Sequence, residues 1–408
     1  MRLFSKHYLC AFLTAAVLGT AAAVAQSDAT SSSAAEVDSA SMAALPTDLH
    51  AGFVIATSGP SIYSAYGHCA VHLTCPSHNL DYCFTFCMDA TFEHYVQFFR
   101  GTALAQYACI PTEAFLRDYV EEGRTVVDHE INLSVDQVRT LWQLFDEECQ
   151  RGPHFHFDFL RKNCSSMSLR AVERCLGGDQ LTFGALPTAV SDTYRHFLRE
   201  ASAQRPWSYF VWGTLLGKVG EEKGTVEDKA SPAYIIETLQ HATFENVDGT
   251  SRPVLTGNTT TLVEGDHNWD RTAFPPMVAL LVLTMAALLV TLLQWRGRAA
   301  MVVRLFDVLL LFAQTLAGIA MFYQSCLSGL DIMHRNWNLL VLNPLPAILW
   351  LCFHKQSWFR RVWMGCSVVI LVYIALAAVT PQIGLLQILM ALPLLVRTAA
   401  NGFLTSKK

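Results

Sequence analysis

The C-terminal third of the chain is almost continuously apolar. Residues 275–400 contain apolar stretches separated by short segments that hold most of the charged side chains of this region. A helix needs about 20 apolar residues to cross the hydrocarbon core of a bilayer. Because the backbone polar groups of such a segment must be satisfied within it, a helical structure is required. We therefore predict an all-α membrane domain over 273–400, with about five transmembrane helices at 275–295, 305–327, 338–354, 362–380 and 382–397.

Composition separates this region from the rest of the chain. Hydrophobic residues make up 52% of the 408 residues and charged residues only 15%, which is unusual for one soluble domain. Most Asp, Glu and His residues fall within 48–272, so we expect a soluble part before the membrane part. The net charge of −5 gives no basic footprint for nucleic acid, and no nucleic-acid partner is predicted.

The N-terminus has the pattern of a secretory signal. Arg2 and Lys6 precede an apolar stretch at 8–18, and Ala23-Val24-Ala25 supplies small residues for cleavage. We predict a signal peptide over 1–25 and a disordered Ser- and Ala-rich spacer over 26–48, so that the soluble part is exported. The alternative is an uncleaved anchor, although the apolar stretch is shorter than a comfortable span.

Basic residues give the same orientation independently. They lie between the first and second predicted spans, between the third and fourth, and at the C-terminus: Arg296, Arg298, Arg304, Lys355, Arg360, Arg361, Lys407 and Lys408. All these positions fall on one side of the membrane, which the positive-inside rule makes cytoplasmic. An odd number of spans then leaves the soluble part, and the loop at 328–337, on the outer side.

The soluble part has the pattern of an α+β domain. Alternating apolar residues predict strands at 52–56, 69–73, 81–86, 103–110 and 125–133. Helical spacing is expected at 92–99, 111–122, 134–151 and 164–176, and Ser134 with Gln137 forms a capping box. We predict a central, mostly antiparallel sheet in a domain at 49–179. An extension and connector at 180–272 follows, and its segment 256–268 is expected to be a polar connector.

A thiol and an imidazole are the strongest candidates for chemistry. Cys164 follows Asn163 at the predicted start of a helix, and His68 precedes a predicted strand. An imidazole beside a thiol can make it a nucleophile, and unpaired N–H groups at a helix start lower a thiol pKa and can hold an oxyanion. We predict a Cys164–His68 acyl-transfer site. The alternative for Cys164 is an inert buried thiol or half of a disulfide.

Three neighbours of this pair are further candidates, each with a structural alternative. Asp81 could orient the imidazole, or be a solvated carboxylate at the start of a strand. Tyr66 could donate to the oxyanion, or be a packed aromatic residue. Asn163 could position Cys164 or cap the helix.

The remaining His and Cys residues show no spacing typical of a metal site and no defined disulfide pairing. His72, His154 and His156 lie near cysteines, but no CxxC pair or HExxH spacing is present, so no metal and no cofactor is predicted. The exported part holds an odd number of cysteines, so at least one must stay free. Which of them pair cannot be deduced from the spacing.

The order of the pair, His before Cys, resembles circularly permuted papain-like folds such as the permuted NlpC/P60 group and the lecithin:retinol acyltransferase-like enzymes. Three motifs resemble more closely the DUF4105-like periplasmic domain of Lnb-type lipoprotein N-acyltransferases of the Bacteroidetes: Ser61-x-Tyr63-Ser64-x-Tyr66-Gly67-His68, Phe98-x-Arg100-Gly101-x3-Ala105-x-Tyr107 and Phe155-x-Phe157-x5-Asn163-Cys164-Ser165. The loop at 333–345 resembles one in that family's membrane domain. An acidic residue usually precedes the Asn-Cys pair, where this chain has Lys162.

The resemblance implies a thiol-dependent acyltransferase of the bacterial inner membrane, multi-pass, with its catalytic domain facing the periplasm. A fatty acyl chain would pass from a phospholipid donor, through a thioester on Cys164, to the N-terminal amine of a diacylated apolipoprotein. Tyr63 in the first motif, and the outer-loop side chains His334, Asn336 and Asn338, are candidates for substrate binding. The alternative for the outer loop is a helix-capping segment that anchors the soluble domain.

Other functions remain open on the same residues. A membrane-tethered cysteine hydrolase acting on phospholipid or peptidoglycan peptides would use the same thiol and base, with water as the second acceptor. A non-catalytic envelope scaffold would instead hold Cys164 in a disulfide.

Overall fold

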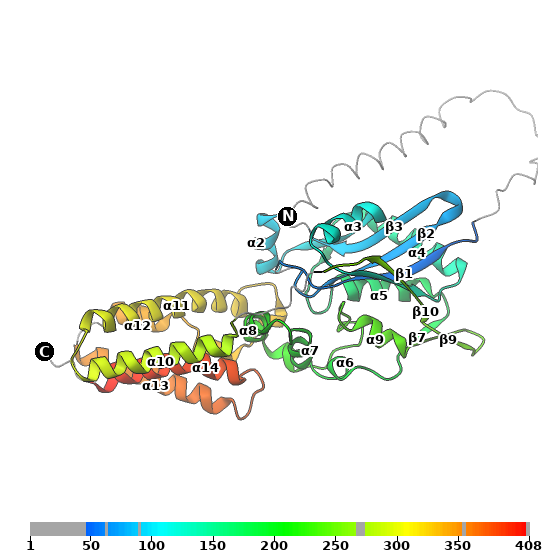
Figure 1. Ribbon diagram of the computed structural model, residues 1–408. Helices are drawn as coiled ribbons and strands as arrows, with labels where there is room; N and C mark the ends of the chain where they lie inside the picture. The colour runs from blue at the N-terminus through cyan, green and yellow to red at the C-terminus, as the bar shows by residue number, and fades with distance from the viewer. Residues whose placement is uncertain (1–45, 62–63, 89–90, 267–273, 353–355, 405–408) are drawn as a thin grey trace, which may run out of the picture.

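The structure is a computed structural model, and it describes residues 46–61, 64–88, 91–266, 274–352 and 356–404. An α+β domain and a helical domain lie end to end, with the C-terminus at the far end of the helical domain (Figure 1). The predicted signal peptide, nearly all of the spacer, and Tyr63 fall outside the described residues.

The α+β domain is built on a seven-stranded sheet in the order β10-β5-β1-β2-β3-β4-β6, in which every neighbouring pair is antiparallel. Its strands are β1 (His50–Ala56), β2 (His68–Cys75), β3 (Leu80–Cys87), β4 (Leu104–Pro111), β5 (Val126–Ile131), β6 (Phe155–His156) and β10 (Leu255–Val263). The predicted α+β class with a mostly antiparallel sheet is confirmed.

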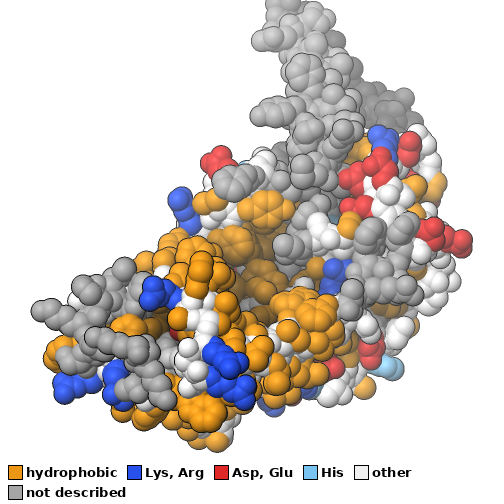
Figure 2. Space-filling model, turned by 60° about the vertical axis from the view of Figure 1, so that its left-hand side comes forward, with side chains coloured by type: hydrophobic (Ala, Val, Ile, Leu, Met, Phe, Trp, Pro, Cys, Tyr) orange, Lys and Arg blue, Asp and Glu red, His pale blue; other side chains and the backbone are white. Residues whose placement is uncertain are grey.

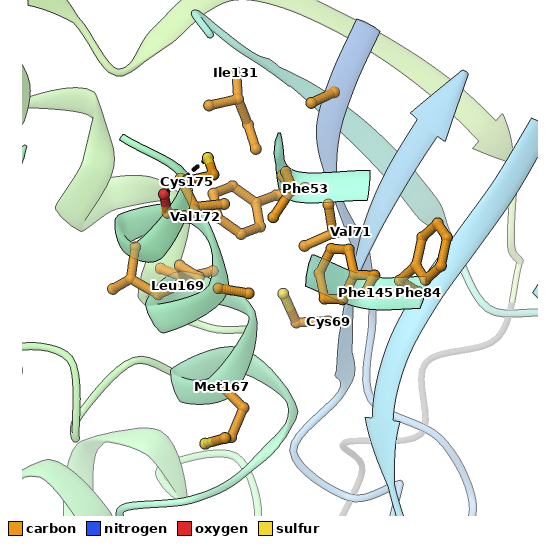
Figure 3. Close-up of a cluster of buried hydrophobic side chains, with 14 of the residues drawn as sticks. Phe53, Cys69, Val71, Phe84, Ile131, Phe145, Met167, Leu169, Val172 and Cys175 are labelled. Carbon is orange, nitrogen blue, oxygen red and sulfur yellow. Dashed lines mark hydrogen bonds between the residues drawn. The ribbon is translucent and has the colours of Figure 1, made fainter. Parts of the chain in front are cut away.

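One face of the sheet packs against α4 (Val135–Arg151) and α5 (Cys164–Cys175). Alternate residues of β2, namely Cys69, Val71 and Leu73, are fully buried on this side. Figure 3 shows Cys69 and Val71 facing the apolar side chains of α5 across the core. Burial of apolar surface contributes about 25 cal/mol per Å², so this layer fixes α5 on the sheet.

The opposite face of the same strands packs against α3 (Thr112–Glu121). Ala70 and Cys83 on the strands meet Phe115 and Tyr119 of the helix in a smaller buried cluster. Because side chains alternate along a strand, His68 belongs to this α3 face while Cys69 belongs to the α5 face. The start of β2 therefore carries polar chemistry on one side and core packing on the other.

Strand β10 corrects the expectation that 256–268 is a polar connector. It pairs with β5 and forms an edge of the main sheet. Its middle is exposed on both sides and consists of Thr, Gly and Asn residues, so the apolar alternation that reveals a half-buried strand is missing. The β-branched threonines still favour an extended backbone.

The extension also supplies small elements beside the main sheet. A second antiparallel sheet contains β7 (Gln180–Thr182), β8 (Thr243–Glu245) and β9 (Ser251–Pro253). The short helices are α6 (Thr188–Ser191), α7 (Tyr194–Ala201), α8 (Pro206–Leu215) and α9 (Ile235–Gln240).

Within the described residues, the helical domain has four helices long and apolar enough to cross a membrane, in α10 (Pro276–Trp295), α11 (Ala300–Cys326), α13 (Gln356–Leu376) and α14 (Leu385–Phe403). The third predicted span corresponds to a shorter apolar helix, α12 (Leu345–Cys352), after the 3₁₀ turn η5 (Trp337–Leu340). The backbone before α12 lies close against α11. A Cβ added at Gly318 of α11 would lie only 2.5 Å from the carbonyl carbon of Asn343.

Helix α8 connects the two domains (Figure 1). Its last carbonyls accept hydrogen bonds from the loop after α11: Asn336 Nδ2 donates to Thr214 O and Leu215 O, each at 2.9 Å, and Asn338 Nδ2 donates to Thr214 O at 3.0 Å. Tyr373 of α13 donates to Asn338 Oδ1 at 2.6 Å. A helix leaves its final carbonyls unsatisfied, and here the loop after α11 satisfies them.

A second contact joins the domains at the end of α2 (Phe92–Arg100). The N–H of Gly329 donates to Arg100 O at 2.7 Å, and Gln324 Nε2 donates to Phe99 O at 3.0 Å. Gly101 has φ +75°, and a Cβ there would lie 2.5 Å from the carbonyl carbon of Gly329. Only glycine therefore permits this backbone approach.

We predict that Asn338→Leu destabilises the whole protein. The change removes the donor to Thr214 and leaves the buried Tyr373 hydroxyl without its acceptor, at a cost of about 2–4 kcal/mol. The melting temperature of the detergent-solubilised protein should fall by about 4–10 °C. Asn258→Ala, which removes an exposed hydrogen bond to Glu130, is the matched control. Equal effects of the two changes would contradict the capping role.

Candidate functional site

Cys164 is the first residue of α5, and Asn163 is its N-cap. Asn163 Oδ1 accepts from the N–H groups of Ser165 and Ser166, each at 3.0 Å, and the N–H of Asn163 donates to Ser166 Oγ at 2.9 Å. This reciprocal cap fixes the start of the helix, and with it the backbone of Cys164. Asn163 is thus a helix cap, which was one of its two predicted roles.

The loop before Cys164 rests on the outer loop of the helical domain. Arg161 donates through Nε to Asp158 at 2.8 Å and through Nη2 to Asp331 at 2.5 Å. Leu160, 2% exposed, packs in one cluster with Leu330 and Ile332. The helix start that carries the thiol is therefore held where the two domains meet.

The thiol of Cys164 lies against the beginning of β2. Burial raises the pKa of Cys164, while hydrogen bonds from the backbone N–H groups of Cys69 and Ser165 oppose the shift. Cys164 forms no disulfide within the described part of the chain. At neutral pH Cys164 is therefore a protonated thiol. It lies beside the backbone of Cys69, the residue that follows His68.

His68 is the first residue of β2, and its ring lies on the α3 face. Its Nε2 is 2.6 Å from Thr85 Oγ1, and the ring centroid is 6.2 Å from that of Phe115. Burial lowers the pKa of His68 to about 4, and the positive charge of Arg124 contributes to the shift. The imidazole is neutral at pH 7. No hydrogen bond joins it to Cys164 in the described residues, although both lie at the start of β2.

Two residues around His68 were not identified from the sequence. Thr85 alternates with Phe84 and Phe86, which are buried on the opposite face, and this polar position in an aromatic strand was the available signal. Arg124 is 4% exposed and lies 4.6 Å above the ring of Tyr119. Its Nε donates to Thr57 O at 2.7 Å, whereas its Nη2 is buried without a partner. No sequence pattern distinguished this arginine.

Asp81 contacts a different imidazole from the one we predicted. Its Oδ1 is 2.8 Å from His72 Nε2, and Asp128 Oδ2 is 2.7 Å from His72 Nδ1. Burial lowers the pKa of His72, but the hydrogen bonds and charges of Asp128 and Asp81 outweigh it and raise the pKa. The side chain bonded to His68 is Thr85, in place of Asp81.

The hydroxyl of Tyr66 points to the helical side of the domain. It lies 3.0 Å from Ser202 Oγ, just after α7, and burial raises the pKa of Tyr66. The structure thus engages Tyr66 with α7, and its predicted role toward an oxyanion stays a prediction.

The outer-loop candidates are held by hydrogen bonds within the protein. His334 Nε2 donates to Ser328 O at 2.9 Å, and the amides of Asn336 and Asn338 cap α8. These contacts are anchoring contacts, and the substrate-binding role stays a prediction. Among the described residues, no group of three or more His, Cys, Asp or Glu side chains is arranged to hold a metal ion.

Fold and site together define a membrane-embedded protein whose α+β domain outside the bilayer carries a thiol and an imidazole at one strand end. Two family models match the chain: the Lnb N-terminal periplasmic domain over residues 40–200, and the Lnb transmembrane domain over residues 268–408. The chain belongs to the Lnb family, with a periplasmic domain followed by a membrane-spanning domain. No curated protein and no solved structure matches it.

We predict that Cys164 reacts as a partly buried thiol of raised pKa. Since the thiolate is the reactive form, alkylation by iodoacetamide should accelerate about tenfold per pH unit from pH 7 to 9, without a plateau. Mass spectrometry of the Cys164 peptide would give the rate. Cys326, exposed at the end of α11, reports reagent access in the same sample. A rate already constant at pH 7 would indicate a preformed thiolate and contradict the prediction.

Proposed function

We propose that this protein is a thiol-dependent lipoprotein N-acyltransferase that moves a fatty acyl chain from a phospholipid to the N-terminal amine of a diacylated apolipoprotein. The observation that carries the proposal is the position of Cys164. The thiol begins a capped helix, lies against the strand that starts at His68, and follows a loop bound to the membrane domain. The resemblance to Lnb-type lipoprotein N-acyltransferases suggests the substrate pair and a bacterial inner-membrane location, and the two family models support a periplasmic domain joined to a membrane domain.

The first half-reaction forms a thioester. Cys164 Sγ attacks an ester carbonyl of the phospholipid while His68 takes the thiol proton. The tetrahedral intermediate collapses, its bond to the glycerol oxygen breaks, and the imidazolium returns the proton to that oxygen. A lysophospholipid leaves and the acyl chain stays on sulfur.

The second half-reaction forms the amide. The α-amino group of the diacylglyceryl-cysteine attacks the thioester carbonyl, and His68 accepts the proton lost by nitrogen. The carbon–sulfur bond breaks and the thiolate recovers a proton from the imidazolium. Both lipids are confined to the membrane, which suits a thiol held at the junction of the two domains.

The pKa values favour proton transfer concerted with attack. Burial lowers the pKa of His68 to about 4 and raises the pKa of the Cys164 thiol, so the separate formation of a thiolate and an imidazolium is unfavourable. Transfer during attack avoids that intermediate state. Catalytic hydrogen bonds are often long in free enzymes and tighten with substrate, so we assign the contact between Cys164 and His68 to the substrate complex.

Backbone and side-chain donors complete the assignment. The cap of α5 uses the N–H groups of Ser165 and Ser166, and we assign the oxyanion to the N–H of Cys164 at the helix N-terminus. We assign the Nε2 proton of His68 to the hydrogen bond with Thr85, which leaves Nδ1 as the base.

We predict that the protein adds an amide-linked acyl chain to lipoproteins and that Cys164→Ser does not. A bacterial strain lacking its own lipoprotein N-acyltransferase would express the parent or a variant, and mass spectrometry would read the lipoprotein N-terminal peptides. Cys326→Ser, which changes an exposed cysteine at the end of α11, is the matched control and should retain activity.

The outcomes separate the chemical alternatives. Amide-linked acylation with the parent and Cys326→Ser alone supports the transferase and its nucleophile. Release of free fatty acid without amide formation would replace it with a hydrolase. If neither the parent nor Cys326→Ser shows acyl transfer or acyl release, at equal abundance in the membrane, a scaffold function would remain.

We predict that Thr85→Val lowers kcat by about 10–100-fold, because the imidazole loses the group that sets its tautomer. Thr85→Ser keeps a hydroxyl and should restore most of the activity. The measurement is initial rate against pH for the parent and both variants. If Val and Ser reduce kcat equally, Thr85 acts through packing alone and not through the hydrogen bond.

A further inference from the structure

A cavity of about 330 Å³ opens at the end of the membrane domain far from the periplasmic domain. It lies between the junction of α10 and α11, the first turns of α13 and the last turn of α14. Because the other end of this domain faces the periplasm, the cavity lies at the cytoplasmic surface of the bilayer. Figure 2 looks onto this end, where Lys and Arg side chains gather, whereas acidic side chains gather on the periplasmic domain.

The cavity wall offers hydrogen-bond donors without acceptors. Arg298 and Arg304 line it, and neither guanidinium has an ion pair within the described residues. Trp363 also lines it, is 7% exposed, and has an indole N–H that is buried without a partner. A buried donor with no acceptor costs free energy, so this wall is complementary to a ligand that accepts hydrogen bonds.

The carboxylate in the wall is already neutralised. The Asp307 carboxylate accepts hydrogen bonds from Nε and Nη2 of Arg397, at 2.6 and 2.8 Å. It accepts another from Nδ2 of Asn401, at 2.9 Å. Two further donors of Arg397 bond to Thr291 Oγ1 and Gln294 Oε1. With this ion pair closed on itself, the charge left facing the cavity is that of Arg298 and Arg304.

The rest of the wall is apolar and borders the lipid-facing surface. Val303, Val308, Leu311 and Phe359 line the cavity, and Val308 is 43% exposed on α11. A fitting ligand therefore combines an anionic, acceptor-rich head with an apolar tail. Basic pockets between helices at the cytoplasmic surface match the headgroups of anionic lipids.

We propose that this cavity binds one anionic phospholipid of the inner leaflet, with its phosphate between Arg298, Arg304 and the indole N–H of Trp363. Its acyl chains lie along the apolar wall beside α11. The site is distinct from Cys164, which lies in the periplasmic domain beyond the opposite end of the membrane domain, so it stands independently of the proposed acyltransfer. Its occupant bridges α11 and α13, which meet the ends of α10 and α14 there.

The test uses the full-length protein purified in a mild detergent and titrated with phosphatidylglycerol, with retained lipid counted by native mass spectrometry. The double variant Arg298→Gln, Arg304→Gln should bind phosphatidylglycerol at least about tenfold more weakly than the parent, because two charged contacts are lost. Arg361→Gln is the matched control, since Arg361 lies at the same end but over the Trp358 ring. It should leave binding unchanged.

A second variant isolates the indole donor. Trp363→Phe keeps an aromatic ring and removes the N–H, and it should weaken binding about 3–10-fold while leaving the melting temperature without lipid unchanged or higher. Phosphatidylcholine, which carries no net charge, should bind the parent at least about tenfold more weakly than phosphatidylglycerol.

Two results would overturn the proposal. Equal phosphatidylglycerol binding by the double variant and by Arg361→Gln would remove the arginines from the site. Complete displacement of the lipid by millimolar inorganic phosphate or glycerol phosphate would show a site for a free anion, in which the apolar wall has no part. Retention of lipid under that competition, with loss in the double variant, supports the lipid site.

Discussion

The carbonyl groups that end α8 impose the main constraint on this molecule. They lie where the periplasmic domain meets the bilayer, and Asn336 and Asn338 satisfy them from the membrane side. The buried guanidinium of Arg195 covers the neighbouring carbonyls of Gly213 and Leu216, at 2.9 and 2.7 Å. Because unsatisfied carbonyls in an apolar setting are costly, the two domains are joined by hydrogen bonds as well as by chain connectivity.

The same junction organises the candidate site. The loop that leads to Cys164 is attached to the membrane domain through Arg161 and Leu160, while α5 is attached to the sheet through its apolar face. His68 is fixed by the sheet, which reaches the extension through β10. The thiol is therefore held by α5 and the loop before it, whereas the imidazole is held by the sheet. The two side chains meet the same end of β2, where this strand begins.

The sequence predicted whatever depends on local periodicity. The spacing of apolar residues and of cap residues predicted strands β1 to β5, the capping box of α4 and the start of α5 at Cys164. Strand β10 was not predicted, because its exposed threonines give no apolar alternation. The span predicted at 338–354 is only partly helical, because its first residues form a 3₁₀ turn and α12 begins later. The partners of Asp81 and His68 depended on the faces and register of the sheet, which one-dimensional patterns do not specify. Arg124 and Thr85 became visible as site neighbours only in three dimensions.

The ion pair between Arg161 and Asp331 has a consequence for lipid access. Since the loop carrying the thiol is fixed to protein, its height over the bilayer is set by the membrane helices and not by the fluid surface. A lipid ester that has to rise to that height exposes acyl methylenes to water, at about 0.8 kcal/mol each. Bilayer thickness changes how deeply the helices sit in the membrane. It therefore changes the free energy that a lipid ester needs to reach the Cys164 thiol.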